Sequence, residues 1–306
     1  ADRLNTESHE VCQLCHAPGV ALPYCVIDSL FGVPGEWGYK QCSHSSCELI
    51  WLDPMPAPQD IGRAYQNYYT HGLSLSVRQS KIARIVERLL HKPCIYALGF
   101  YHERNQYKRM FLDDVPKGRL LEVGCGDGKR LARMRALGWQ VTGQEVDSAA
   151  AQYASTNWGL DVHLGELQTL ATEDKFDVII MSHVIEHVYD PVALLSTCYQ
   201  LLKSEGTLVI LTPNVASYGH QKFGANWRGL EPPRHLYLFT RATLIAAVQK
   251  AGFRSNKYWT TAVSAYGIGR DSFKSVQKTE NQIHAIAVSD VLRGIFFQIM
   301  ASFTFM

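Results

Sequence analysis

The sequence predicts an α/β fold with a doubly wound, mostly parallel sheet, and two observations carry this prediction. From Gly118 onward, short apolar runs of strand length alternate with stretches of helical spacing, the βαβ rhythm that builds parallel sheets. The first of these runs ends in three alternating glycines, Gly124, Gly126 and Gly128, ahead of a helix-spaced stretch. Glycines at such a turn allow positive φ and let a ligand approach the backbone. The helix that follows offers unpaired N–H groups, so we expect a ligand site there.

The strands and helices of this domain follow from their apolar runs and end signals. Asp190 precedes Pro191 at a helix start, and Gly252 follows a periodic run that begins after Thr240. Strands are expected at 119–123, 139–143, 160–164, 176–181 and 206–212, with a sixth near 256–263.

The chain divides into three parts by composition. Residues 1–58 are loop-like and rich in Gly, Pro and Cys, and three closely spaced prolines end them. Residues 59–117 look mainly helical and aromatic, as a linker or lid. Residues 118–306 form the α/β domain. A length of 306 residues exceeds one average domain, which agrees with a core plus an accessory region.

Composition and charge exclude some classes of partner. The chain is 46% hydrophobic and 19% charged with a formal net charge of +2, and it has no dense Lys/Arg run, so we expect no nucleic-acid partner. No secretory signal opens it, so a cytoplasmic location is expected. Because the first residue is Ala, we also expect that the natural N-terminus is missing.

The apolar end of the chain, IFFQIMASFTFM, allows two interpretations. With Asp290 and Arg293 close by, it is too short for a stable membrane span. We expect either a sequence truncated at its C-terminus or a tail that touches a membrane peripherally.

The spacing around the glycine turn indicates which ligand binds. The dinucleotide fingerprint places its third glycine where this chain has Lys129, so that fit is poor. Here the spacing is G-x-G-x-G, preceded by Glu122, and the second strand ends in Glu145, 21 residues after Gly124. An acid at that distance can accept both hydroxyls of a ribose.

With LLEVGCGDGKRL (120–131) and this acid, the chain resembles the class I S-adenosylmethionine-dependent methyltransferases, whose first motif is commonly E/D-x-G-x-G-x-G. The resemblance implies a Rossmann-like sheet, with S-adenosylmethionine as the cofactor. The cofactor-binding residues expected from it are Glu122, Gly124, Cys125, Gly126, Gly128, Glu145 and Val146, with the adenine near Glu166, Leu167, Ser182 and His183.

Four cysteines predict a structural zinc site. Cys12 and Cys15 form one close pair and Cys42 and Cys47 a second, and two such pairs can supply four thiolates to one tetrahedral ion. Disulfides are the main alternative, and His44 could replace Cys42 as the fourth ligand. The surrounding text resembles the N-terminal zinc ribbon of a bacterial methyltransferase subgroup that often modifies sugars or cell-surface polysaccharide intermediates. This resemblance extends through YQNYYTH (65–71).

Candidate catalytic groups follow the fourth strand. The text SHVIEHVYDP (182–191) contains the E-H-V-x-D-P form of the loop that closes over the cofactor in the family. Glu186 and His187 would lie just beyond a strand carboxyl end, and a histidine can remove a proton from the acceptor near neutral pH. The alternative is a polar pair that caps the next helix.

A long connection, residues 212–240, holds the second candidate base, His235. Long ordered loops in compact domains tend to be lids or binding loops. In the resembling subgroup the W-R-G-x-x-P-P-R-H segment (227–235) borders the acceptor site, where Arg228 or Arg234 could bind an anionic group such as a sugar-nucleotide phosphate. The alternative is a proline-stiffened surface loop with one buried histidine.

The sequence therefore predicts methyl transfer from S-adenosylmethionine to a small molecule, sugar nucleotide or glycan precursor. A catalytically silent module that combines a zinc ribbon with cofactor binding is the alternative. A nicotinamide-dependent oxidoreductase is disfavoured by the glycine spacing.

Overall fold

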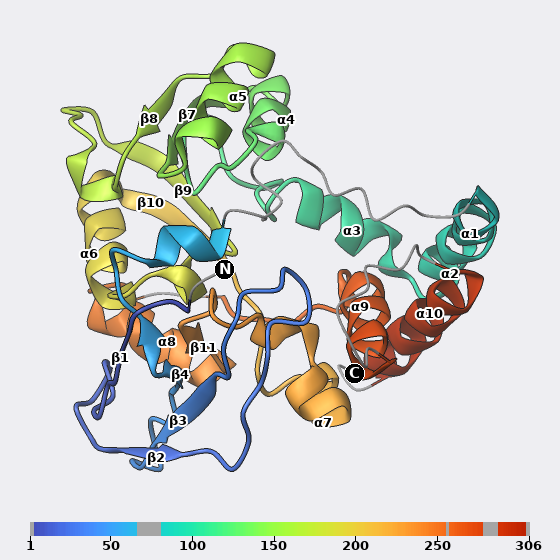
Figure 1. Cartoon of the computed structure of the whole chain (residues 1–306). Helices are drawn as coiled ribbons and strands as arrows, with labels where there is room; N and C mark the ends of the chain where they lie inside the picture. The colour runs from blue at the N-terminus through green and yellow to red at the C-terminus, as the bar shows by residue number, and fades with distance from the viewer. Residues whose placement is uncertain (1–2, 66–80, 255–256, 278–286, 304–306) are drawn as a thin grey trace.

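The structure is a computed structural model, and it describes residues 3–65, 81–254, 257–277 and 287–303 (Figure 1). The strands are β1 (Thr6–Glu7), β2 (Gly19–Ala21), β3 (Gly38–Cys42), β4 (Ile50–Asp53), β5 (Met55–Pro56), β6 (Arg119–Val123), β7 (Gln140–Glu145), β8 (Val162–Leu164), β9 (Phe176–Ser182), β10 (Leu202–Leu211) and β11 (Tyr237–Leu238). The α-helices are α1 (Lys81–Val86), α2 (Lys92–Ala97), α3 (Phe100–Lys108), α4 (Lys129–Ala136), α5 (Ser148–Trp158), α6 (Pro191–Leu201), α7 (Tyr218–Phe223), α8 (Arg241–Lys250), α9 (Ala265–Gln277) and α10 (Val288–Phe303). Short turns of helix are η1 (Ile61–Tyr65), η3 (Glu87–His91), η4 (Leu167–Thr169), η5 (Ile185–His187), η6 (Gly224–Asn226) and η7 (Arg228–Leu230).

A five-stranded parallel sheet forms the core of the larger domain, in the order β10-β9-β6-β7-β8. Side chains alternate along the central strands, so Leu120 and Ile180 belong to one apolar cluster and Leu121 and Ile179 to another. Helices α4 and α5 pack on one face, and α6 packs on the other. This arrangement confirms the predicted α/β fold with its doubly wound sheet.

The sixth strand expected near 256–263 is wrong for residues 257–263, which contain no strand. The Trp259 ring packs edge-on against Phe111, with ring centroids 4.8 Å apart. The carbonyl of Ala262 accepts a 2.8 Å hydrogen bond from Gln298 Nε2 of α10. At least this carbonyl is therefore bonded to a helix instead of to a strand, and β10 is the edge of the sheet among the described strands.

The N-terminal part is more ordered than its loop-like sequence suggests. Strands β2, β3 and β4 form an antiparallel sheet, and β11, from the long connection after β10, pairs with β4. In that pairing Tyr237 lies opposite Trp51, and both side chains are buried. Residues nearly 190 positions apart therefore complete one sheet. Whether the chain divides at residues 58 and 117 stays a prediction.

A group of helices lies beside the parallel sheet and the four-stranded antiparallel sheet (Figure 1). Helix α1 and the turn η3 pack along α10, and Ala83, Val291 and Ile295 are buried between them. Of the YQNYYTH segment, residues 66–71 lie outside the described residues. In the part of the chain that is described, no helix is long and apolar enough to cross a membrane.

Candidate active site

The glycine turn connects β6 to α4, and each of its glycines has a positive φ. A Cβ on Gly124 would lie 2.5 Å from a methyl carbon of Val184, and one on Gly128 would lie 2.7 Å from Ala154 Cβ. Nothing lies within 4 Å of the Cβ position of Gly126. Two glycines are therefore required by packing as well as conformation, and the third leaves open space beside the backbone.

Glu145, at the end of β7, binds the backbone of this turn. Its Oε2 accepts a 2.8 Å hydrogen bond from Gly126 N–H, and its Oε1 accepts bonds from Val146 and Asp147 N–H at 2.8 and 3.0 Å. A carboxylate has about four acceptor positions, so one remains. The preceding residue, Gln144, accepts from Gly124 N–H and donates to the Gly165 carbonyl. This pair joins the glycine turn to the loop after β8.

Two buried polar atoms lie at the carboxyl ends of the neighbouring strands β6 and β9. Glu122 accepts a 3.0 Å bond from Arg130 through Oε1, but its Oε2 has no partner among the described residues. The hydroxyl of Ser182 is also buried without a partner there. Burial raises the pKa of Glu122 to about 7, against the opposing charge of Arg130. Buried polar atoms rarely stay unpaired, which is consistent with a ligand at this edge.

The other residues predicted to bind the cofactor differ in exposure. Val146 is 65% exposed and Glu166 is exposed, whereas Leu167 and Cys125 are buried. His183 has a positive φ of 57° and a half-exposed side chain. All of them follow or flank strand ends of the parallel sheet, and their contact with a cofactor stays a prediction.

The three candidate catalytic residues come together, although they lie up to 49 positions apart in the sequence. One ligand atom from each of Glu186, His187 and His235 lies within 4.8 Å of the others. The two imidazole rings meet edge to face with centroids 4.7 Å apart. Glu186 accepts hydrogen bonds from His183 at 3.3 Å and from Thr212 at 2.9 Å.

Main-chain carbonyls orient both imidazoles. His187 Nδ1 lies 3.0 Å from the Arg234 carbonyl and 2.9 Å from the Tyr65 hydroxyl, and His235 Nδ1 lies 2.8 Å from the Gly229 carbonyl. A carbonyl oxygen only accepts, so the proton of each neutral ring is assigned to Nδ1. Each Nε2 then carries a lone pair.

Burial decides the charge states of this histidine cluster. It lowers the pKa of His187 and lowers that of His235 to about 4, so both rings are neutral near pH 7. Burial opposes the ionisation of Glu186, but the hydrogen bond from His183 and the nearby imidazoles outweigh it and lower its pKa to about 2. The cluster thus combines a carboxylate with two proton acceptors.

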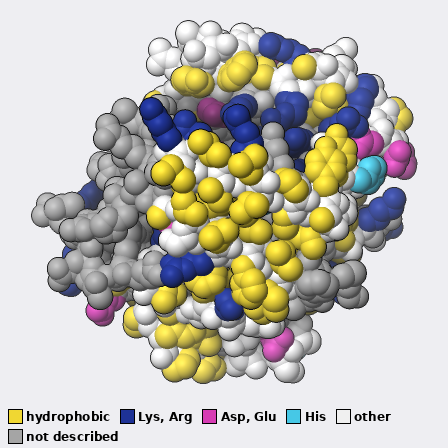
Figure 2. All heavy atoms as spheres, turned by 90° about the vertical axis from the view of Figure 1, so that its right-hand side faces the viewer, with side chains coloured by type: hydrophobic (Ala, Val, Ile, Leu, Met, Phe, Trp, Pro, Cys, Tyr) yellow, Lys and Arg dark blue, Asp and Glu magenta, His cyan; other side chains and the backbone are white. Residues whose placement is uncertain are grey.

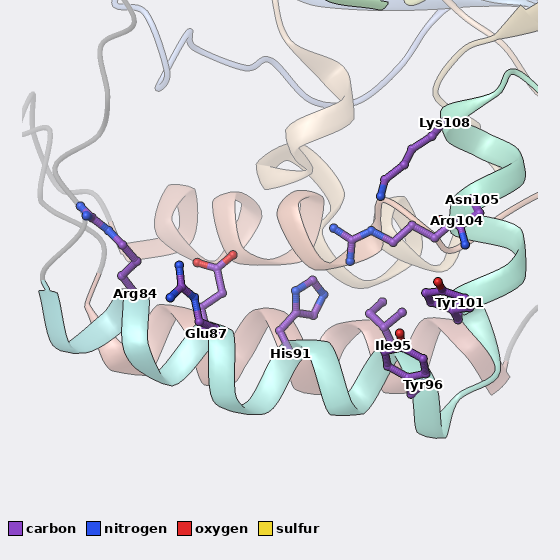
Figure 3. Close-up of a pocket in the computed structure, with 10 residues that line it drawn as sticks. Arg84, Glu87, His91, Ile95, Tyr96, Tyr101, Arg104, Asn105 and Lys108 are labelled. Atoms are coloured by element: carbon purple, nitrogen blue, oxygen red, sulfur yellow. The ribbon is translucent and has the colours of Figure 1, made fainter. Parts of the chain in front are cut away.

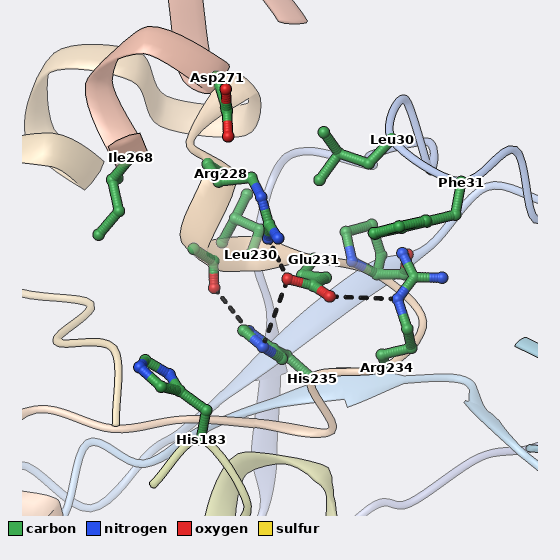
Figure 4. Close-up of polar contacts among 12 residues, drawn as sticks. Leu30, Phe31, His183, Arg228, Leu230, Glu231, Arg234, His235, Ile268 and Asp271 are labelled. Carbon is green, nitrogen blue, oxygen red and sulfur yellow. Dashed lines mark hydrogen bonds and ion pairs between the residues drawn. The ribbon is translucent and has the colours of Figure 1, made fainter. Parts of the chain in front are cut away.

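A buried network of ions supports His235 (Figure 4). Glu231 pairs with Arg228 and Arg234, and its Oε2 lies 3.8 Å from His235 Nε2. Arg234 is 0% exposed and donates to Asp28 at 2.9 Å and to the Ala64 carbonyl at 3.1 Å. The expectation that Arg234 binds an anionic group of the acceptor is therefore wrong, because protein partners already satisfy it.

The four N-terminal cysteines also come together. Their sulfurs all lie within 4.8 Å of one another, with Cys12 and Cys47 3.6 Å apart and Cys15 and Cys42 3.3 Å apart. These distances exceed a disulfide bond of about 2.05 Å and approach the ~3.8 Å sulfur separation of a tetrahedral site with bonds of about 2.3 Å. None of the four forms a disulfide with another described residue, and His44 contacts Ser46 instead.

Sequence reasoning did not single out several supporting residues. Gln144 had a detectable signal, because it directly precedes the acid at the end of a strand. Asp28 and Tyr65 had none, since their partners Arg234 and His187 are far away in the sequence. Glu231 lies three or four positions from its partners, but in a proline-rich loop that spacing alone does not indicate ion pairs.

Residues 97–257, more than half of the chain, match a family model described as a methyltransferase domain. The ubiquinone biosynthesis O-methyltransferase of Cereibacter sphaeroides is 32% identical over 146 residues, covering 44% of this chain and 59% of that protein. The protein of the same name from Xanthomonas campestris pv. campestris is 34% identical over 107 residues, covering 33% and 45%. The chain therefore spans about half the length of these curated relatives.

Two solved structures match parts of the chain at lower identity. A methyltransferase from Thermotoga maritima, described as a possible histamine N-methyltransferase, is 23% identical with a TM-score of 0.43, covering 56% of this chain and 81% of that one. A sugar N-methyltransferase from Streptoalloteichus is 22% identical with a TM-score of 0.32, covering 36% and 47%.

Proposed function

The chain belongs to the methyltransferase-domain family, and from this premise we propose that it transfers a methyl group from S-adenosylmethionine to a small-molecule acceptor. The observation that carries this proposal is the glycine turn at the end of β6, with Glu145 bound to it from the end of β7. Ligands of open α/β sheets bind outside the carboxyl ends of the strands, where these residues lie.

The residues present fit the cofactor. Glu122 Oε2 and Ser182 Oγ are buried without partners among the described residues; Glu122 could accept hydrogen bonds from its ammonium group, and Ser182 could bond a polar edge of its adenine. The open backbone at Gly126 leaves room beside the turn. We assign the cofactor to Glu122, Gly124, Cys125, Gly126, Gly128, Glu145 and Val146, and its adenine to Glu166, Leu167, Ser182 and His183. When bound, it supplies an electrophilic methyl group on a sulfonium.

Glu145 must exchange one contact to bind two ribose hydroxyls. Three backbone N–H groups already occupy its carboxylate, and about one acceptor position remains. The bond from Gly126 is the one that lies across the turn, so we propose that it is the one exchanged. Glu145 then orders the turn in the free protein and holds the ribose in the complex.

His187 is the favoured general base, with His235 as the second candidate. The hydrogen bond to the Arg234 carbonyl holds the His187 ring with Nε2 free to take a proton. His235 is 4% exposed, and Glu231 faces its Nε2, so an acceptor has less access to it. Glu186 would stabilise the imidazolium formed when either ring takes the proton.

Zinc is proposed in a structural role at Cys12, Cys15, Cys42 and Cys47. Their sulfurs have the separations that a tetrahedral site needs, and backbone N–H groups point at two of them. All four positions would be protein ligands, which leaves none for a substrate.

The proposed acceptor is a small molecule, a sugar nucleotide or a glycan precursor. The curated relatives are named as O-methyltransferases, which favours a hydroxyl as the methylated group. A hydroxyl also gives the general base a proton to remove.

The test uses labelled S-adenosylmethionine with a panel of sugar nucleotides and phenols. We expect calorimetric binding of the cofactor and formation of labelled product with S-adenosylhomocysteine. Cofactor binding without turnover on cell-extract acceptors would support the silent module instead. Failure to bind the cofactor at all would reject the proposal.

A further inference from the structure

One side of the helical part exposes an unusual number of large apolar side chains. Helices α1 and α10 bury their inner faces against each other, so their outer faces point to solvent. Figure 2 shows this side, where hydrophobic side chains gather over the middle and Lys and Arg side chains border them. We call the following residues, which are 46–67% exposed, the apolar face: Ile82, Ile85, Leu89, Leu90, Leu292 and Phe296.

An exposed apolar face of this kind indicates an interaction site. Monomeric proteins rarely expose contiguous apolar patches of more than a few hundred Å², and larger ones mark interaction sites. Its members recur at helical spacing along α1, η3 and α10, and Figure 2 shows hydrophobic side chains gathered over this side of the molecule. Among the described residues, these side chains stay about half exposed although the inner faces of α1 and α10 are buried.

A cationic cavity lies beside the apolar face. It has a volume of about 550 Å³ and lies between α3 and the consecutive elements α1, η3 and α2 (Figure 3). Arg104 and Lys108 reach into it from α3, and Arg84 and Arg88 line it from α1 and η3. Among the described residues that line it, Glu87 is the one carboxylate. Among the described residues, these four cations take part in no ion pair.

Two tyrosines connect the cavity to the surface. Tyr96 and Tyr101 also line it, with rings stacked 4.6 Å apart, and they are 61% and 49% exposed. Tyrosine is favoured where an apolar surface meets water, because its ring is apolar and its hydroxyl is polar. The helical surface thus combines an apolar face, exposed tyrosines and cations, the kinds of side chain that suit the acyl chains, the interface and the phosphates of a lipid bilayer.

Charge decides between possible occupants. A second copy of the chain docked through the same face would bring two sets of unpaired cations together. A nucleic acid would match the cations, but it offers no apolar surface for Ile85 or Phe296. An anionic phospholipid bilayer satisfies both features.

We propose that the apolar face and the cationic cavity form a peripheral docking site for anionic membranes. The apolar face enters the boundary between headgroups and acyl chains, and Arg84, Arg88, Arg104 and Lys108 bind lipid phosphates. This inference does not depend on methyl transfer, because docking needs only the helical surface.

The test is co-sedimentation of the full chain with phosphatidylcholine vesicles, with and without phosphatidylglycerol. We expect binding to the anionic vesicles only, weakened by salt. Each basic residue near such a surface increases membrane binding roughly fivefold. The double variant Arg88→Glu with Arg104→Glu should therefore reduce vesicle binding by about 25-fold or more. The double variant Leu89→Gln with Phe296→Gln should also abolish it.

Matched controls change exposed residues elsewhere. Arg133→Glu on α4 and Val20→Gln on β2 should bind vesicles as the unchanged protein does, and circular dichroism should show every variant folded. Equal binding to neutral and anionic vesicles, or none to either, would overturn the proposal. So would tight binding of free glycerol phosphate without vesicle binding, or a dimer that the apolar double variant dissociates.

Discussion

The glycine turn and the histidine cluster are assembled in opposite ways. The turn is closed by contacts between residues about 20 positions apart, such as Gly126 with Glu145. The cluster depends on contacts over 122 positions, from Tyr65 to His187, and over 206 positions, from Asp28 to Arg234. The proposed cofactor end is therefore built locally, whereas the proposed acceptor end depends on the N-terminal sheet. Substitutions that disrupt the acceptor end should therefore leave cofactor binding intact, and substitutions at the cofactor end should leave the histidine cluster intact.

Removal of zinc should have the largest effect. Structural zinc contributes about 10–16 kcal/mol in small zinc domains, comparable to the stability of a whole protein. Loss of the N-terminal sheet removes the partner of β11 and with it the setting of His235. For Cys12→Ser we expect turnover below about a thousandth of normal, because catalysis by the cluster is lost, with cofactor affinity nearly unchanged. Metal analysis, calorimetry and product assays check this, with Cys25→Ser as the control. Full turnover in metal-free protein would show that the histidine cluster does not depend on zinc, and an equal loss of cofactor affinity would show that the two ends are not separate.

Substitution of the base should come next. His187→Ala should lower turnover about 10²–10⁴-fold and leave cofactor affinity unchanged, because a general base acts in the transition state. His102→Ala, an exposed histidine on α3, is the control. If His187→Ala is harmless and His235→Ala is not, the roles are reversed. If both variants keep full turnover, the acceptor needs no base.

The buried ion pair between Asp28 and Arg234 allows the acceptor end to be tested by measuring the free energy of unfolding. Arg234→Met leaves the Asp28 carboxylate buried without its cation, and breaking such a pair costs about 3–5 kcal/mol. Urea unfolding should show this loss, and the double variant with Asp28→Asn should recover part of it. A loss below about 1 kcal/mol, the range of an exposed pair, would mean that the pair is solvated.

The pH dependence of stability should come from the same cluster. The folded-state pKa of His235, about 4, lies below the ordinary value of 6.5, so the unfolded chain takes up a proton that the folded chain does not. The contribution of His235 to the free energy of unfolding is therefore fully present above pH 6.5, and it is lost as the pH falls toward 4. One pKa unit corresponds to about 1.4 kcal/mol, so the difference between 6.5 and about 4 gives a loss of about 3 kcal/mol. His235→Gln should fall less steeply over this window, and equal slopes would place the titration elsewhere.

The smallest effect is expected at the cofactor end, for substitution of Glu145. Glu145→Ala should weaken cofactor binding by about 1.5–3 kcal/mol, the value of charge-assisted hydrogen bonds. Because Glu145 also binds three backbone N–H groups, thermal stability of the free protein should fall as well. Unchanged affinity in calorimetry would remove Glu145 from the cofactor site. Leu164→Ala, exposed at the end of β8, serves as the comparison.

The same contrast explains what the sequence could predict. Strand periodicity and glycine spacing are local, so the parallel sheet and the glycine turn followed from the sequence. The pairing of β11 with β4 has no local signal, because Tyr237 and Leu238 read only as part of a proline-rich loop. The sixth strand failed for a related reason, since Gln298, far along the chain, takes the backbone carbonyl that a strand would use. The sequence does not indicate that His187 and His235 lie together, because their contact depends on the fold of the whole chain.

The pairing of β11 with β4 also limits how this architecture could be inherited. An ancestor without residues 1–58 would leave Arg234 buried without Asp28, and Tyr237 and Leu238 without a strand to pair with. Gain or loss of the N-terminal segment would therefore disturb the loop that carries His235. Any relative that lacks it must reach a different solution for its acceptor loop, so the sequence of that loop and the presence of the cysteine segment should change together across the family.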